Sequence, residues 1–194
     1  MNFNDGIIRP ELHDSIEKQL GDLIDQCAQG GCPNIIGIGG QLRGMSKEKA
    51  ADNAVLFFNR IKARLEDKNV MLVTEVVNTR NDDPALGRTD QMMNHTEYGV
   101  EIMKRVGSPK VRILCDVYHM QIMDGDIARR IRENYQWIGH FHTGGVPGRH
   151  ELDETQEINY RYVAHVIADL GYTGFVAHEY RPSEGRDHFA SLKQ

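Results

Sequence analysis

The chain has 194 residues, 40% of them hydrophobic and 26% charged, with a formal net charge of −5 at pH 7, which fits a water-soluble globular protein with a substantial core. An acidic chain without a basic patch is not expected to bind nucleic acid, and no apolar run approaches the ~20 residues of a membrane span. The start of the chain does not resemble a signal peptide, and the three cysteines, Cys27, Cys32 and Cys115, form no paired framework, so we expect reduced thiols and a cytoplasmic location.

Hydrophobic periodicity predicts five helices and five strands that alternate along the chain, after a polar lead-in over residues 1–11. The predicted helices cover residues 13–29, 46–65, 89–106, 126–135 and 159–170. The predicted strands cover residues 34–40, 70–76, 111–116, 137–142 and 174–179, and residues 117–120 extend the third strand. We expect helix N-caps at Ser46, Thr89 and Asn159, and a polar tail with a loop at 181–186.

The alternation of helices with apolar strands predicts an α/β fold in which helices cover a parallel sheet. No internal repeat or domain boundary interrupts the pattern, so we expect a single domain over residues 1–194. The pattern alone leaves two architectures open: an open doubly wound sheet, or most of an eight-stranded barrel.

Four residues with metal-binding side chains share one position in the predicted strands. Glu75, Asp116, His142 and Glu179 each lie near the C-terminal end of an apolar strand. In a parallel barrel these ends meet at one mouth, where such folds keep their active sites. Three carboxylates and an imidazole suit a divalent ion such as Mg²⁺, Mn²⁺ or Co²⁺, whereas a structural zinc site would use sulfur. Singly, each has a plainer explanation, such as a solvated carboxylate, a turn cap at Asp116 or a core histidine at His142.

Other histidines and methionines near these strands are assigned by their position. His140 shares the inward face of its strand with His142, whereas His178 is expected to point toward the helices. Met92 and Met93 are expected to pack in the core. We assign no chemistry to these residues.

Several motifs together resemble a known superfamily. They are LVTEVVN around Glu75, DVYHMQ at 116–121, IGHFH at 138–142, PGRHE at 147–151 with EINY at 157–160, and HEY at 178–180. Over residues 14–182 the chain resembles the xylose-isomerase-like TIM-barrel superfamily, most closely its hydroxypyruvate-isomerase-like branch. The matching segment corresponds to barrel strands four to eight.

The resemblance implies a barrel with one divalent metal ion. It places the metal ligands at Glu75, Asp116, His142 and Glu179, and makes Glu75 and Glu179 the paired acid/base carboxylates. His119 and Arg149 match residues that contact the substrate. His119 would donate a hydrogen bond to a substrate oxygen, although it could simply orient Asp116. Arg149 would bind a substrate carboxylate, although it could simply lie on a surface loop.

The implied activity is that of an intramolecular oxidoreductase of the aldose–ketose type. The substrate would be a small hydroxy-carbonyl compound, hydroxypyruvate or a ketose, that isomerises through an enediolate. Some hydroxypyruvate isomerases carry glutamine at the position of His142, and histidine there favours a ketose 3-epimerase.

The resemblance also leaves about three β/α units unaccounted for before His13, which predicts an N-terminally truncated barrel with an open side. A truncated product, a homo-oligomer that covers the opening, and a rearranged N-terminus would each explain it. A non-catalytic truncated barrel is therefore a second hypothesis. A third is an apurinic-endonuclease-type phosphodiesterase, but such enzymes have an Asp-Arg-His triplet where this chain has Gly148-Arg149-His150, and they need additional zinc-binding histidines.

Overall fold

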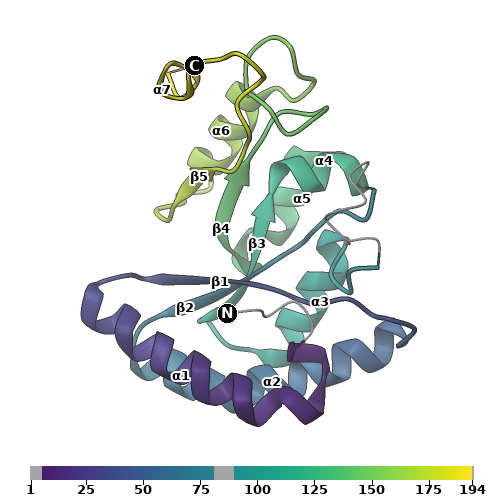
Figure 1. Ribbon diagram of the computed structural model, residues 1–194, viewed down its shortest axis with the longest axis vertical. Helices are drawn as coiled ribbons and strands as arrows, with labels where there is room; N and C mark the ends of the chain where they lie inside the picture. The colour runs from purple at the N-terminus through teal and green to yellow at the C-terminus, as the bar shows by residue number, and fades with distance from the viewer. Residues whose placement is uncertain (1–5, 81–89, 194) are drawn as a thin grey trace.

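The computed structural model describes residues 6–80 and 90–193 of the chain. Five parallel strands form one sheet in the order β1-β2-β3-β4-β5, so each strand pairs only with its neighbours in the sequence (Figure 1). The strands are β1 (Asn34–Ile38), β2 (Met71–Glu75), β3 (Val111–Asp116), β4 (Ile138–Thr143) and β5 (Val176–His178). The helices are α1 (His13–Gly30), α2 (Lys47–Asp67), α3 (Thr96–Val106), α4 (Val117–Met123), α5 (Ile127–Asn134), α6 (Tyr160–Asp169) and α7 (His188–Ser191).

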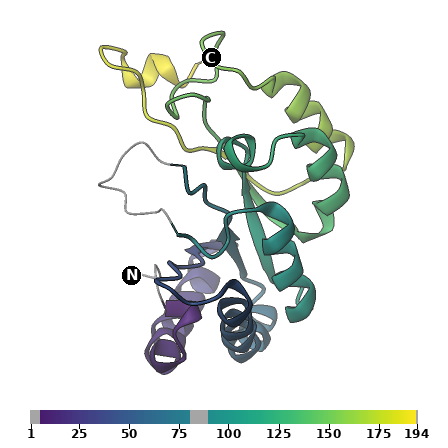
Figure 2. The ribbon, with the colours of Figure 1, turned by 90° about the vertical axis from the view of Figure 1, so that its right-hand side faces the viewer.

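The sheet is curled, and the long helices form an arc around its outer side (Figure 2). This confirms the predicted α/β fold with about five parallel strands and covering helices. An eight-stranded barrel closes on itself, whereas the five strands here leave β1 and β5 as edges. The inner side chains nearest these edges remain accessible: Ile36 is 44% exposed and Phe175 is 55% exposed.

Local sequence signals account for where several helices begin and end. The Ser46 side chain accepts a hydrogen bond from the Lys49 backbone N–H at 3.2 Å, and Asn159 accepts one from Tyr162 at 3.0 Å. Both residues are therefore N-caps, as predicted. Helix α1 ends at Gly30 and is capped by Gly31, whose φ of +70° is the left-handed conformation that glycine adopts readily.

The segment after β3 differs from its prediction. Residues 117–120 do not extend the strand but begin helix α4, because Asp116 Oδ1 accepts a hydrogen bond from the Tyr118 backbone N–H at 2.9 Å and caps the helix. The N-terminal lead-in also differs, since Ile7 and Ile8 are buried in the core.

Two further boundaries were predicted incorrectly. Helix α3 begins at Thr96 rather than near Thr89, which lies outside the described residues. Strand β5 spans only three residues, so Glu179 directly follows it, and the polar tail contains the short helix α7. The boundaries of the other strands and helices lie close to those predicted.

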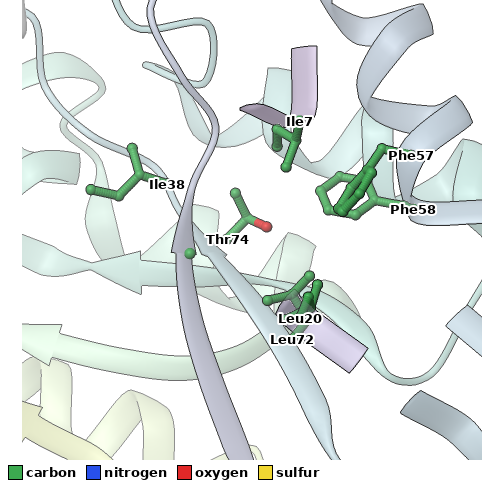
Figure 3. A pocket seen from close by; sticks show the side chains of 8 residues that line it. Ile7, Leu20, Ile38, Phe57, Phe58, Leu72 and Thr74 are labelled. Carbon is green, nitrogen blue, oxygen red and sulfur yellow. The ribbon is translucent and has the colours of Figure 1, made fainter. Parts of the chain in front are cut away.

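The main core fills the space between the sheet and helices α1, α2 and α3, where Phe57, Phe58, Met92 and Met93 are almost fully buried. A cavity of about 10 Å³ remains there, lined mostly by aliphatic and aromatic side chains (Figure 3). It is at most the size of one water molecule, so it is a packing gap rather than a ligand site. Within the described ranges, no helix is long and apolar enough to cross a membrane.

Strand β4 packs closely against β2 and β3 at Gly139. A Cβ atom at this position would lie 2.4 Å from Met71 Sδ, 2.8 Å from Val73 Cγ1 and 2.9 Å from Arg112 Cβ. Only glycine fits such an approach without moving its neighbours. The alternation that follows turns His140 and His142 to the inside, with their rings 5.0 Å apart, and buries Phe141 against Tyr172 on the helix side.

Candidate active site

The four residues with metal-binding side chains come together at the C-terminal ends of four adjacent strands. Glu75 ends β2, Asp116 ends β3, His142 lies in β4 and Glu179 follows β5. Each offers a potential ligand atom, and these atoms all lie within 4.8 Å of one another. Glu75, Asp116 and His142 are buried, whereas the Glu179 side chain is 45% exposed at the open side of the sheet. We refer to these four residues as the carboxylate cluster.

Asp116 has two structural roles in this arrangement. Its Oδ1 atom caps helix α4, and its Oδ2 atom lies 2.6 Å from Arg149 Nη2. Burial raises the pKa of this carboxyl, and the nearby His119 and Arg149 only partly oppose that effect. Asp116 therefore needs a positive partner to remain ionised in this buried position.

Helix α4 places His119 beside the cluster. His119 Nε2 lies 3.3 Å from Glu75 Oε1, yet neither atom completes a hydrogen bond within the described part of the chain. The other ring nitrogen, Nδ1, lies 2.6 Å from the buried Asn78 amide nitrogen. With the amide N–H donating to Nδ1, the Nε2 atom carries the proton and is the donor that faces the cluster.

His142 and Glu179 form a close pair, with His142 Nδ1 2.5 Å from Glu179 Oε2. Burial alone would raise the pKa of Glu179, but the His142 hydrogen bond and the charges of Arg149 and His142 outweigh it and lower the pKa. Burial likewise opposes protonation of His142, and the hydrogen bond to Glu179 with the surrounding carboxylates raises its pKa instead. The pKa of His142 thus reflects the carboxylates around it, and that of Glu179 reflects its cationic neighbours His142 and Arg149.

Arg149 reaches the cluster from the loop that follows β4. Its Nη2 atom lies 2.6 Å from Asp116 Oδ2, 2.8 Å from Glu179 Oε2 and 3.8 Å from Glu75 Oε1. The Arg149 backbone is fixed by a bond from its N–H to the Gly145 carbonyl and by a bond from the Arg181 N–H to its carbonyl. The guanidinium therefore sits among three carboxylates on a rigid part of the loop.

The donor set fits a divalent cation. Glu75 Oε1 is a buried carboxylate oxygen without a hydrogen bond in the described region. The positively charged Arg149 Nη2 already approaches all three carboxylates of the cluster. Oxygen-rich sites with one imidazole are typical of Mg²⁺, Mn²⁺ and related ions. Glu75, Asp116, His142 and Glu179 are the residues that would hold such an ion.

Glu151 ties this loop to the C-terminal segment. Its buried carboxylate accepts hydrogen bonds from the Ser183 backbone N–H at 3.0 Å, from Ser183 Oγ at 2.5 Å and from Ser191 Oγ at 2.8 Å. These bonds, led by that of the Ser183 hydroxyl, lower the pKa of Glu151 to about 2. The ionised form is therefore the one that holds the segment in place.

We expect Glu151→Gln to lower the free energy of unfolding at neutral pH. In acid, the stabilities of the variant and the parent should become more similar. The folded-state pKa lies below the unfolded value, so the contribution of Glu151 is present above pH ~4.5 and is lost as the pH falls toward ~2. Urea unfolding at pH 7, 4 and 3 measures this. Glu184→Gln, at an exposed position on the same segment, is the control. A loss of stability in Glu151→Gln that is equal at all three pH values would contradict the prediction.

One residue of the site was missed by the sequence analysis. Asn78 lies between the predicted strand at 70–76 and the predicted helix at 89–106 and was given no role, yet it is fully buried and orients the His119 ring. A signal was present, because asparagine directly follows the apolar run Val76-Val77 in a chain whose strands end in chemically active residues. His140 faces inward as predicted, and His178 contacts Thr143 on the other side of the strand.

The family model described as "Xylose isomerase-like TIM barrel" matches residues 4–194. The chain belongs to this family. Among relatives, the 2-oxo-tetronate isomerase of Cupriavidus necator is 38% identical over 118 residues, which cover 61% of this chain and 43% of that protein. The Homo sapiens protein named "Putative hydroxypyruvate isomerase" is 33% identical over 157 residues, covering 78% of this chain and 55% of that protein. These relatives support the hydroxypyruvate-isomerase-like branch.

The chain spans about half the length of the curated relatives it matches. Among solved structures, one titled as an AP endonuclease, family 2, from Brucella melitensis superposes with a TM-score of 0.81 at 28% identity. The match covers 92% of this chain and 66% of that one. The β/α units of this chain therefore share the fold of about two thirds of that longer chain.

Proposed function

We propose that this chain is a divalent-metal-dependent isomerase of a small hydroxy-carbonyl compound. The observation that carries the proposal is the carboxylate cluster: three carboxylates and an imidazole from four adjacent strands, with potential ligand atoms within 4.8 Å. Relatives named as isomerases of 2-oxo acids support the same reaction class. A bound divalent ion would polarise the substrate carbonyl and stabilise negative charge on its oxygen.

Glu75 and Glu179 are the candidates for proton transfer. Glu75 is buried, with one carboxylate oxygen that makes no hydrogen bond in the described region, so it can accept the proton beside the carbonyl. Glu179 lies at the open side and can return a proton to the neighbouring carbon. The enediolate between these two steps is the species that the site must stabilise.

His119 and Arg149 are the candidates for binding the substrate. The Asn78 bond leaves the His119 Nε2–H free to donate to a substrate oxygen. The Arg149 guanidinium can bind a carboxylate through two parallel hydrogen bonds, which suits a 2-oxo acid better than an uncharged ketose. We therefore rank hydroxypyruvate and 2-oxo-tetronate above ketoses as substrates.

A ketose 3-epimerase is the second candidate, because His142 occupies the position where some hydroxypyruvate isomerases carry glutamine. The two reactions use the same first step and differ in the carbon to which the proton returns. Product analysis by NMR in deuterated water separates them, since an epimerase exchanges the hydrogen on the inverted carbon.

The experiment that tests the proposal combines metal binding with a substrate panel. We expect Mn²⁺ at 100 times its Kd to stabilise the metal-stripped protein by about 2.7 kcal/mol, a rise in Tm of roughly 5–10 °C. Glu179→Gln should lose most of this shift, whereas the exposed Glu184→Gln should keep it. The panel contains hydroxypyruvate, 2-oxo-tetronate, ketoses and abasic DNA, of which a 2-oxo acid should be converted.

The isomerase proposal would be abandoned if metal-loaded protein converted none of the carbonyl compounds while Glu179→Gln bound Mn²⁺ as tightly as the parent. Cleavage of abasic DNA would instead support a phosphodiesterase. A cooperative melt without turnover would support the non-catalytic barrel.

A further inference from the structure

The guanidinium of Arg149 occupies the position of a cation in the carboxylate cluster. Its Nη2 atom lies 2.6 Å from Asp116 Oδ2 and 2.8 Å from Glu179 Oε2, and the Arg149 side chain is only 18% exposed. It approaches Glu75 Oε1 to 3.8 Å as well. One charged nitrogen thus bridges carboxylates at the C-terminal ends of three different strands.

The atoms that Arg149 contacts are those that a metal ion would need. Asp116 Oδ1 is committed to capping helix α4, so Oδ2 is the oxygen left for a cation, and Arg149 holds it. Glu179 Oε2 is shared between Arg149 and His142. An ion bound to these oxygens would lie close to the guanidinium, and like charges repel strongly in a buried site, so the two cations compete for the cluster.

We propose that Arg149 is the resident cation of the metal-free cluster and that a divalent ion binds by displacing its guanidinium. This inference rests on the proposed function, and it assigns Arg149 a role in metal affinity in addition to substrate binding. The Arg149 backbone is fixed by bonds to Gly145 and Arg181, so the exchange requires movement of the side chain alone. Displacement would also free the Nη2 atom to donate to a substrate carboxylate.

Titration calorimetry with Mn²⁺ on metal-stripped protein tests the competition. If Arg149 competes for the site, the apparent Mn²⁺ affinity of the parent equals the intrinsic affinity multiplied by the fraction of protein in which the site is free. Arg149→Met should therefore bind Mn²⁺ at least about tenfold more tightly than the parent. Arg161→Met, which removes the same charge from an exposed position on α6, is the control and should match the parent. A crystal structure of the parent with Mn²⁺ should show Arg149 Nη2 away from both Asp116 Oδ2 and Glu179 Oε2.

Two results would overturn the inference while leaving the metal site in place: Mn²⁺ affinity of Arg149→Met no higher than that of the parent, or Mn²⁺ in the cluster with Arg149 still bonded to Asp116. Absence of Mn²⁺ binding in both proteins would overturn this inference together with the proposed metal dependence. The structure of the parent keeps the test decisive if Arg149→Met does not fold.

Discussion

Glu75→Gln should lower kcat/KM by about 10²–10⁴-fold, the usual effect of removing a general acid or base. Glutamine has the shape of glutamate but cannot accept the proton, and it presents a neutral oxygen to the buried His119 Nε2 at the 3.3 Å separation seen in the parent. The measurement is kcat/KM at saturating Mn²⁺ on whichever 2-oxo acid the parent converts, with the Mn²⁺ Kd of the variant determined separately.

The matched control is Glu133→Gln, an exposed position on α5. It makes the same chemical change away from the cluster, so its kcat/KM should equal that of the parent. Full activity of Glu75→Gln at saturating metal would remove Glu75 from the acid/base pair and leave Glu179 to act with another group.

Phe141→Ala should reduce the free energy of unfolding by about 3–5 kcal/mol, as is typical for deleting a buried aromatic ring. Phe141 is fully buried on β4, and its ring meets Tyr172 edge to face at 4.9 Å. It lies between His140 and His142, so the cavity would loosen the strand that carries a candidate ligand. Urea unfolding and thermal melting measure the loss, which corresponds to a fall in Tm of roughly 10 °C.

Phe189→Ala is the control for this prediction. Phe189 is 79% exposed on α7, so removing its ring should change stability by less than about 0.5 kcal/mol. An equally small effect at Phe141 would mean that β4 repacks without cost, and the inward register of His142 would then need another explanation.

The helix caps and the central strands were predictable because their signals are local. Ser46 and Asn159 cap their helices by bonding backbone groups three residues away, and the apolar runs of β2 and β3 are buried on both faces. Residues 117–120 were misassigned because four apolar or aromatic residues after a strand carry no helical period of their own. The Asp116 side chain caps helix α4 and so makes this segment helical. The sequence left that role open, because Asp116 could equally have been a metal ligand.

Tertiary context explains the remaining differences. The apolar run at 174–179 predicts a buried strand, but β5 has a partner on one side only, so Val176 is 51% exposed and the ladder ends after three residues. The meeting of Glu75, Asp116, His142 and Glu179 followed from the common direction of parallel strands. The position of Arg149 depends on loop geometry, including its φ of +59°, which no spacing of residues could indicate.

Because every strand pairs only with its neighbours in the sequence, stability in this chain is distributed as in a linear array of repeats. Strands β2 and β3 have partners on both sides and should open only with global unfolding, whereas β5 should fray first and show the fastest hydrogen exchange of the sheet. Glu75 and Asp116 belong to the stable centre, and Glu179 belongs to the fraying end. An ion bound by all of them would link the stable strands to the less stable C-terminal β/α unit. Ion binding should therefore slow hydrogen exchange in β5, and loss of structure in β5 should weaken ion binding.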